Sequence, residues 1–171
     1  MIPILETERL VMREWRLEDS GPMADFYADE ELSRRVGGPG NAGAAWRACA
    51  VEAGHWVLRG FGQWVLEEKA SCAMVGWAGL SQLCHLPELQ IAWALFRAYH
   101  GKGYATEAVG RARDHAYCEM GRTTLVSYIA PDNHASKRVA IRLGAVHEHT
   151  IDLRGERAEV FRHPGPEQLK H

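Results

Sequence analysis

The sequence predicts one α+β domain in which a mixed, mostly antiparallel β-sheet has helices on both faces. Three observations carry this prediction: runs with apolar residues at alternate positions, runs with apolar residues three and four positions apart, and a strand–helix–strand unit over residues 87–131. That unit implies two parallel strands joined by a right-handed crossover. The remaining strands follow one another closely enough to form hairpins, so the sheet is expected to be mixed.

The first half of the chain predicts two helices between strands. The signals occur in the order 9–15 (strand), 17–32 (helix), 44–60 (helix), 61–68 (strand) and 72–83 (strand). Asp19 and Ser20 are candidate N-caps of the first helix, and Gly60 is a typical end for the second. Residues 36–43 have the composition of a loop. The core-facing positions of the second helix are expected to be Trp46, Cys49, Ala50, Ala53 and Trp56 or Val57.

The second half of the chain predicts alternating strands and helices and then a hairpin. The signals occur in the order 87–96 (strand), 103–120 (helix), 123–131 (strand) and 132–144 (helix). Asp132 or Asn133 is expected to cap the last helix, which ends at Gly144. Two closing strands are expected to turn at Arg154-Gly155. The buried face of the 103–120 helix is expected to consist of Ala105, Ala108, Val109, Ala112 and Ala116.

The composition is that of an ordinary globular protein. A chain of 171 residues fits one domain over residues 1–171, with a disordered tail at 166–171. A formal net charge of -2 leaves no basic surface for a nucleic-acid partner. The four cysteines contain no Cys-x-x-Cys pair, so reduced thiols and no metal site are expected. The sequence has no signal-peptide or membrane-spanning pattern, and we expect a cytoplasmic protein without a membrane partner.

A glycine-rich stretch, His100 to Thr106, connects the predicted strand at 87–96 to the predicted helix at 103–120. Ligands of such sheets bind beyond the carboxyl ends of parallel strands, ahead of the next helix. A helix start leaves about four backbone N–H groups unpaired and attracts phosphate oxygens. Gly101 and Gly103 allow close approach, and Lys102 adds positive charge. The stretch predicts a diphosphate site; the alternative is a plain loop-to-helix turn.

Three motifs resemble one protein family. The stretch "HGKGYA" resembles the Gln/Arg-x-x-Gly-x-Gly/Ala signature of the GCN5-related N-acetyltransferases (GNAT family), and "GKGYATEA" is similar to their RimJ/RimL branch, which acetylates ribosomal-protein N-termini. The segment "ETERLVMREWRLED" resembles the opening Thr-x-Arg-Leu-x-Leu-Arg strand of that branch. The segment "NHASKRVAIRLGA" resembles its Asn-x-x-Ser-x-x-Val helix. The resemblance extends from Glu6 to about His163 and implies the GNAT fold.

The resemblance also implies a co-substrate and where it binds. Acetyl-CoA, without a metal, is expected to place its pyrophosphate on the backbone of residues 101–106 and its pantetheine arm along the preceding strand. There the strand at 87–96 parts from the strand at 123–131. The small side chains of Ala92 and Ala94 fit such an arm, or equally a packed helix. The implied contacts are Ala94, Leu95, Phe96, His100, Gly101, Lys102, Gly103, Tyr104, Ala105, Thr106, Asn133 and Ser136.

Acetyl transfer requires a neutral amine, a donor for the developing oxyanion and a proton for the departing thiolate. A backbone N–H near Leu95 is the candidate oxyanion donor. Ser136 is the candidate for assisting the thiolate, and its alternative role is a local hydrogen bond in the first helical turn. Glu88 is the candidate base through water, or a solvated carboxylate. Many relatives carry a tyrosine and a glutamate where Ala140 and Gln90 stand here.

Two functions stay open. The first is an N-acetyltransferase for a primary amine of a peptide or small molecule, and the second is a non-catalytic acetyl-CoA-binding module, suggested by Gln90 and Ala140. Residues 38–43 match Gly-x-Gly-x-x-Gly but follow no buried strand, which excludes a dinucleotide fold. The closing hairpin is a candidate for pairing in a homodimer. The sequence does not identify the acceptor.

Overall fold

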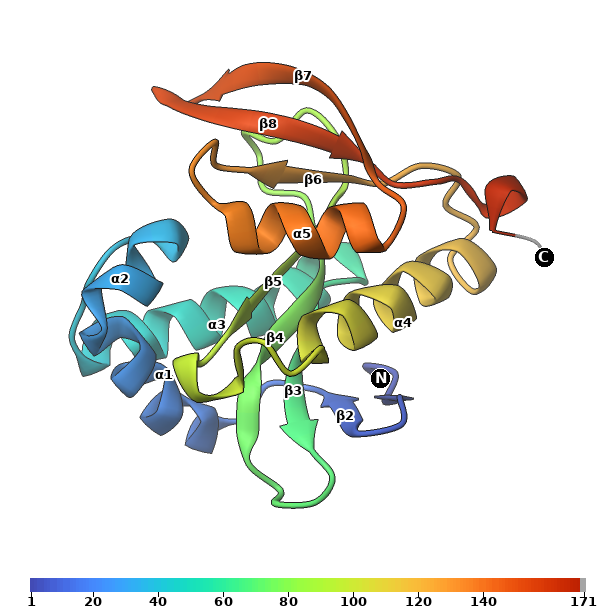
Figure 1. Cartoon of the computed structure of the whole chain (residues 1–171). Coiled ribbons are helices and arrows are strands. Elements are labelled where there is room, and N and C mark those ends of the chain that lie inside the picture. Colours follow the sequence, from blue (N-terminus) through green and yellow to red (C-terminus); the bar gives the residue numbers. More distant parts are fainter. Residues whose placement is uncertain (170–171) are drawn as a thin grey trace. The chain divides into compact units, whose positions relative to one another are not determined.

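The computed structural model describes residues 1–169 and contains one mixed sheet with five α-helices (Figure 1). The strands are β1 (Leu5–Glu6), β2 (Leu10–Arg13), β3 (Gln63–Glu68), β4 (Met74–Ser81), β5 (Gln90–Leu95), β6 (Val126–Ile129), β7 (Val146–Leu153) and β8 (Glu156–Arg162). The strand order is β1-β2-β3-β4-β5-β6-β8-β7, and β5 and β6 are parallel. The predicted mixed sheet with one parallel pair is therefore confirmed.

The helices alternate with these strands largely as the sequence predicts. They are α1 (Ser20–Ala28), α2 (Glu30–Ser33), α3 (Ala42–Arg59), α4 (Tyr104–Cys118) and α5 (His134–Arg142), with short 3-10 helices η1 (Leu17–Asp19), η2 (Arg34–Val36), η3 (Arg97–Tyr99) and η4 (Pro166–Gln168). No helix within residues 1–169 is long and apolar enough to cross a membrane. The four cysteines are free thiols; Cys49 is buried, whereas Cys72, Cys84 and Cys118 are exposed.

The chain divides into two compact units. One consists of Met1–Trp77 with Ala94–Tyr104, and the other of Ala78–Trp93 with Ala105–His171. Both β4 and β5 contribute residues to each unit. The expectation of a single domain over residues 1–171 stays a prediction. Residues 166–168, expected to be disordered, form η4 in the structure, and residues 170–171 lie outside the described part.

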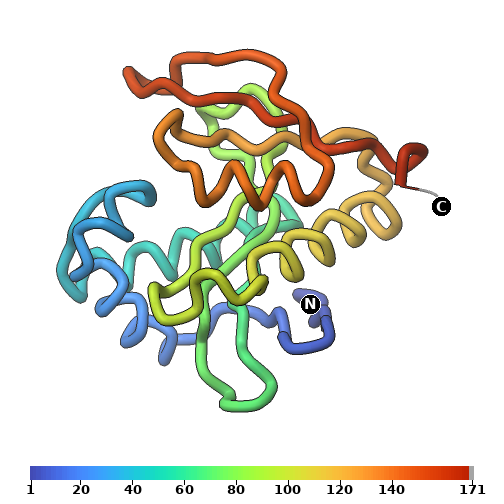
Figure 2. The backbone as a smooth tube through the Cα atoms, in the orientation of Figure 1, coloured from blue at the N-terminus to red at the C-terminus, as the bar shows by residue number. Residues whose placement is uncertain are grey.

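The first unit packs α1 and α3 against each other and over an aromatic core. Phe26 of α1 meets Trp77 of β4 edge-to-face, with ring centroids 4.7 Å apart, and meets Phe96 at 5.6 Å. The β2–β3 pair is antiparallel, and the β3–β4 hairpin predicted from the sequence is present. Figure 2 follows the backbone through this hairpin. The buried members of the cluster are Trp15, Met23, Phe26, Tyr27, Ala45, Cys49, Val65 and Trp77.

The inner face of α3 differs from the predicted one. Trp46 and Ala50, expected in the core, are exposed, Trp46 by 53%, while Ala45 is fully buried. Of the two alternatives Trp56 and Val57, Trp56 is the buried one, and Cys49 and Ala53 pack inward as predicted. The buried stripe is therefore rotated by one residue at the start of the helix. A small residue at position 45 lets the helix backbone approach the core closely. The prediction chose Trp46 because its side chain is large and apolar, but size alone does not decide which face is buried. Gly60, with φ 75°, ends the helix as predicted.

The predicted helix over residues 17–32 is interrupted at Asp29. This residue is extended, at φ -82° and ψ 104°, and its carboxylate accepts the N–H groups of Glu31 and Leu32, which starts α2. Aspartate competes for backbone N–H groups in this way and so restarts helices. Asp19 occupies the N-cap position of α1, as expected, but its carboxylate makes no capping hydrogen bond to that helix and instead binds the Arg13 guanidinium at 2.8 and 2.9 Å.

The second unit contains α4, α5 and the closing hairpin. The α4 face formed by residues 108, 109, 112 and 116 is fully buried, as predicted. Asn133 caps α5 by accepting the N–H of Ser136 at 3.1 Å, and Gly144 follows the helix with φ 83°. Strands β7 and β8 turn at Arg154-Gly155, as expected. Among residues 1–169, β7 pairs only with β8, and six of its eight residues are exposed.

Gly76 lets β4 approach β5 closely. Its φ is 153°, and a Cβ built on it would lie 2.2 Å from the carbonyl oxygen of Ala94 and 2.8 Å from the Cα of Leu95. Because these atoms belong to the backbone, neither a side-chain movement nor a rotamer change can make room. Gly76 therefore fixes the position of the last two residues of β5.

We expect Gly76→Ala to destabilise the protein by about 3 kcal/mol, through backbone strain and overpacking. For a chain of this size that lowers the melting temperature by roughly 6–12 °C. Gly54→Ala is the matched control, because a Cβ at this position in α3 would meet nothing within 4 Å. The control should be neutral or stabilising by up to about 1 kcal/mol. Equal melting temperatures for the two variants would contradict the role given to Gly76.

Candidate functional site

The predicted glycine loop is a tight turn that connects β5 to α4. Gly101 and Gly103 have φ values of 73° and 85°, a left-handed region that glycine adopts without strain. A Cβ at Gly101 would meet nothing within 4 Å, so conformation rather than space requires glycine there. Helix α4 begins at Tyr104, directly after the second glycine. Its first amides lack intrahelical acceptors and are available to an anion.

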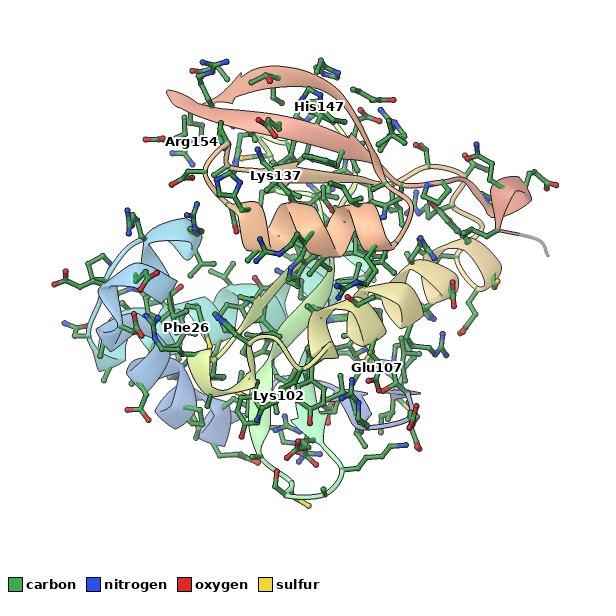
Figure 3. The ribbon with its side chains drawn as sticks, viewed as in Figure 1. Phe26, Lys102, Glu107, Lys137, His147 and Arg154 are labelled. Atoms are coloured by element: carbon green, nitrogen blue, oxygen red, sulfur yellow. The ribbon has the colours of Figure 1, made fainter. Side chains whose placement is uncertain are left out.

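Side chains from the start of the chain hold this turn in place. Arg9 Nη1 donates to the carbonyl oxygen of Lys102 at 2.9 Å, and the Arg9 guanidinium lies 4.4 Å from the centroid of the Tyr104 ring. The Tyr104 hydroxyl donates to the carboxylate of Glu68. Lys102, labelled in Figure 3, places its Nζ 5.2 Å from the centroid of the Tyr99 ring. Sequence reasoning used the Arg9 motif only for recognition and missed this contact.

His100 contacts the backbone of β5. Its ring Nε2 lies 2.9 Å from the carbonyl oxygen of Leu95. A carbonyl only accepts hydrogen bonds, so Nε2 carries the proton and, in the neutral ring, Nδ1 is an acceptor. In this tautomer the neutral ring has no further N–H to offer a phosphate. His100 therefore fastens the loop to the end of β5, and its expected role as a phosphate contact stays a prediction.

The backbone N–H of Leu95 points away from β4. The next N–H along the strand, that of Phe96, donates to the carbonyl oxygen of Val75 in β4 at 3.0 Å. Successive backbone N–H groups of a strand point to opposite edges. The Leu95 N–H therefore faces the edge of β5 opposite β4, an orientation that the expected oxyanion donor requires.

Strands β5 and β6 pair over one position. Gln90 is opposite Val126, and the Val126 N–H donates to the carbonyl oxygen of Leu89 at 3.3 Å. One step further, the carbonyl oxygen of Ile91 accepts the Ser127 hydroxyl at 2.7 Å rather than continuing the paired register. Within the described residues, the register therefore ends where the sequence predicted that the two strands part.

A buried histidine orients the Ser127 hydroxyl. His163 Nε2 lies 2.9 Å from Ser127 Oγ, and His163 is 2% exposed. Because Ser127 gives its proton to Ile91, the imidazole N–H must donate to Ser127 Oγ. Burial lowers the pKa of His163 to about 4, so the ring is neutral at physiological pH. Local sequence patterns did not predict the contact between Ser127 and His163, because the two residues are 36 positions apart.

The first turn of α5 contains the predicted Asn133 and Ser136. The Asn133 side chain is engaged as a helix cap. The Ser136 N–H donates to the Asn133 side chain, while the Ser136 hydroxyl has no hydrogen-bond partner among residues 1–169. Its hydroxyl therefore remains available to donate a proton, and the alternative of a local side-chain hydrogen bond is not observed. Ala140, on the same helix, is fully buried and carries no proton donor.

Glu88 precedes β5 and is engaged in an ion pair. Both carboxylate oxygens accept hydrogen bonds from Arg162, at 2.6 and 2.9 Å. Hydrogen bonds from Arg162 hold the pKa of Glu88 below its ordinary value. Lowering the pKa of a carboxylate makes it a weaker base, so this pair argues against Glu88 as the general base. Arg162 also forms an ion pair with Glu148 at 2.9 Å, and both of these residues are distant from Glu88 in the sequence.

Thr106 carries an unsatisfied polar atom at the start of α4. Its Oγ1 is buried and has no hydrogen-bond partner within residues 1–169. Buried hydroxyls are nearly always paired, so an orphaned one next to a glycine turn suggests a missing ligand. Tyr104 and Ala105 are buried, and a ligand at this turn would meet their backbone. No three His, Cys, Asp or Glu side chains in this described part converge on a metal position.

Comparisons with known proteins agree with this architecture. Residues 9–146 match the family model described as "Acetyltransferase (GNAT) domain". A crystal structure of an acetyltransferase from Agrobacterium tumefaciens str. C58 is 31% identical, with 95% of both chains covered and a TM-score of 0.85. The protein described as "Uncharacterized N-acetyltransferase YoaA" from Bacillus subtilis is 22% identical over 84% of this chain and 83% of its own length.

A third relative is similar in fold. RimJ from Mycobacterium smegmatis, solved in complex with CoA-disulfide, has a TM-score of 0.75 and 15% identity, covering 95% of this chain and 84% of its own. At this identity the likeness is one of fold. The family model covers most of the chain, and the Agrobacterium relative matches nearly all of it. The chain is therefore an acetyltransferase of the GNAT family.

Proposed function

We propose that this protein transfers the acetyl group of acetyl-CoA to a primary amine by direct attack in a ternary complex. The observation that carries the proposal is the turn of two left-handed glycines at the start of α4, next to the orphaned hydroxyl of Thr106. These features fit a diphosphate, which accepts hydrogen bonds from helix-start amides and from a hydroxyl. Acetyl-CoA supplies an activated acyl group as its thioester.

We assign the residues that bind acetyl-CoA from the hydrogen bonds and charges that they can offer to it. The amides from Gly101 to Thr106 and the Thr106 hydroxyl hold the pyrophosphate, with the Lys102 ammonium adding positive charge. The backbone of residues 94–96 holds the pantetheine arm beyond the single β5–β6 pair. Asn133, as the cap of α5, positions the first turn that carries Ser136. His100 acts through the backbone by fastening the loop to β5.

The transfer itself uses two groups of the chain. The Leu95 N–H donates to the thioester oxygen as negative charge develops there, a contribution typically of a few kcal/mol. The acceptor reacts as the neutral amine: its nitrogen forms a bond to the acyl carbon, the carbon–sulfur bond breaks, the nitrogen loses one proton to water, and the sulfur gains one proton, so that the products are the amide and the free thiol of coenzyme A. The Ser136 hydroxyl, unpaired among residues 1–169, donates to the departing thiolate.

The first test is amine-dependent release of free thiol. The protein is mixed with acetyl-CoA and a panel of primary amines: peptides with free N-termini, a polyamine and an aminoglycoside. We expect thiol release that requires one class of amine, together with acetylated product by mass spectrometry. Tight binding of coenzyme A without turnover on any amine would contradict the enzyme and favour the non-catalytic binding module.

The second test concerns Arg9, which holds the glycine turn through the Lys102 carbonyl and the Tyr104 ring. We expect Arg9→Met to raise the KM for acetyl-CoA about tenfold, because a hydrogen bond from a charged donor is worth about 1.5–3 kcal/mol. The effect on kcat should be smaller. Arg59→Met, at the exposed end of α3, is the control. Unchanged KM values in both variants would remove Arg9 from the binding site.

The third test concerns Ser127, whose hydroxyl ends the parallel register. Ser127→Ala leaves a buried carbonyl and a buried imidazole N–H without a partner, at a cost of roughly 1–3 kcal/mol for each group. We expect a lower melting temperature and a higher KM for acetyl-CoA. Ser127→Thr keeps the hydroxyl and should restore both. A Thr variant as impaired as the Ala variant would show that shape, rather than the hydroxyl, is required.

A further inference from the structure

The core-facing stripe of α3 contains one carboxylate. Residues 45, 49, 52 and 56 are spaced by four, three and four positions and so share one face of the helix. Ala45, Cys49 and Trp56 on this face are buried, with exposed fractions of 0%, 7% and 6%. Glu52 is the remaining member of this face, and it is partly exposed. A glutamate therefore stands where a packed helix ordinarily places an apolar residue.

Glu52 contacts Gln63, and Gln63 in turn contacts two tryptophans. Gln63 Nε2 donates to Glu52 Oε1 at 3.2 Å, and Gln63 itself is 7% exposed. The backbone carbonyl of Gln63 accepts the indole N–H groups of Trp15 and Trp56, at 2.9 and 3.0 Å. Gln63 therefore contacts Glu52 through its side-chain amide and both indoles through its backbone carbonyl. Carboxylates and aromatic faces are the two groups that recognise organic ammonium ions.

No cation within residues 1–169 forms an ion pair with Glu52. Within residues 1–169 its one hydrogen bond is with Gln63, and no Lys, Arg or His pairs with it. Two titratable groups near Glu52 are the Tyr27 hydroxyl of α1 and the Cys49 thiol of α3; burial is the main cause that raises the pKa of each, and the charge of Glu52 adds to it. Arg13, a buried cation of the same unit, is already engaged by Asp19 and Glu67.

Burial without a counter-ion has a measurable consequence. It raises the pKa of Glu52 to about 7. A desolvated carboxylate without a cation is unfavourable for folding, and such groups are found where a ligand supplies the missing charge. The same side of α3 packs toward the strand assigned to the thioester: Cys49 and Ala53 belong to one cluster with Ala94 and Phe96.

We propose that Glu52 and Gln63, together with the neighbouring indoles of Trp15 and Trp56, form the subsite for the ammonium group of the acceptor. This inference rests on the proposed function and narrows its substrate to primary alkylamines, which bind here as ammonium ions and lose a proton before the transfer. The Glu52 carboxylate supplies the counter-charge, the indole rings enclose the carbon chain next to the nitrogen, and the Gln63 amide orients the carboxylate.

The test measures binding without acetyl-CoA, by thermal shift and calorimetry. The probes are pairs of equal shape: phenethylamine and phenethyl alcohol, and putrescine and 1,4-butanediol. At about pH 8 the ammonium of at least one pair should stabilise the wild type, whereas its alcohol should not. Binding should weaken about tenfold between pH 8 and pH 6, as Glu52 takes up a proton. Equal effects of ammonium and alcohol, or no effect of any ammonium, would overturn the subsite.

Glu52→Gln keeps the shape and removes the charge, and Glu14→Gln, an exposed carboxylate of the same unit, is its control. In Glu52→Gln the difference between ammonium and alcohol should disappear, and the KM for the accepted amine should rise at least about tenfold with the KM for acetyl-CoA unchanged. A KM for the amine within twofold of the wild type would overturn the subsite.

The free protein provides a further check on Glu52. A carboxyl whose pKa is raised on folding stabilises the native state less as the pH rises from about 4.5 to about 7. Glu52→Gln should therefore melt above the wild type at about pH 8 and level with it at about pH 4.5. Equal melting at both pH values would mean that the charge is already compensated, which contradicts the subsite.

The two proposals fail separately. If ammonium ions bind through Glu52 but release no thiol from acetyl-CoA, the proposed transfer is wrong and the subsite stands. If thiol release depends on an amine and Glu52→Gln leaves its KM unchanged, the transfer stands and the subsite is wrong.

Discussion

The left-handed conformations of Gly101 and Gly103 determine how the chain passes from β5 into α4. With any other residue at these positions, the turn would carry backbone strain of about 1 kcal/mol or more. Because of the turn, α4 begins immediately beyond the strand and its first amides remain unpaired. The contacts of Arg9, Tyr104 and His100 then keep the turn in one arrangement. The proposed anion site is thus built from backbone geometry and needs only a few supporting side chains.

Three glutamates illustrate how the surroundings decide the role of one side chain. Hydrogen bonds from Ser71 and then Tyr104 lower the pKa of Glu68, and those from Arg162 lower the pKa of Glu88. Both are ionised acceptors that serve to hold structure. Glu52 has an amide partner but no cation, and burial raises its pKa. Ionised carboxylates with full sets of donors stabilise a fold, whereas one short of a counter-charge is suited to bind a ligand.

Local patterns predicted most of the elements, because helical spacing, alternation and glycine positions are properties of neighbouring residues. The glycine turn, the buried face of α4 and the Arg154-Gly155 hairpin are of this kind. Contacts between distant residues were beyond such reasoning: Glu88 and Arg162 are 74 positions apart, and Arg9 and Lys102 are 93 apart. The rotation of the α3 stripe was missed because packing distance, not residue size, decided that Ala45 rather than Trp46 faces inward.

The cysteines affect how turnover can be measured. Burial raises the pKa of the Cys49 thiol to about 11, so a colorimetric disulfide reagent should leave it untouched in the folded state. Cys72, Cys84 and Cys118 are exposed and will react with the same reagent, adding up to three equivalents of colour per chain before any catalysis. Cys72 has φ 56°, so asparagine or glycine is the appropriate replacement there, while serine suits the other two. A variant in which these three exposed cysteines are replaced would give a thiol-release assay without background colour from the protein.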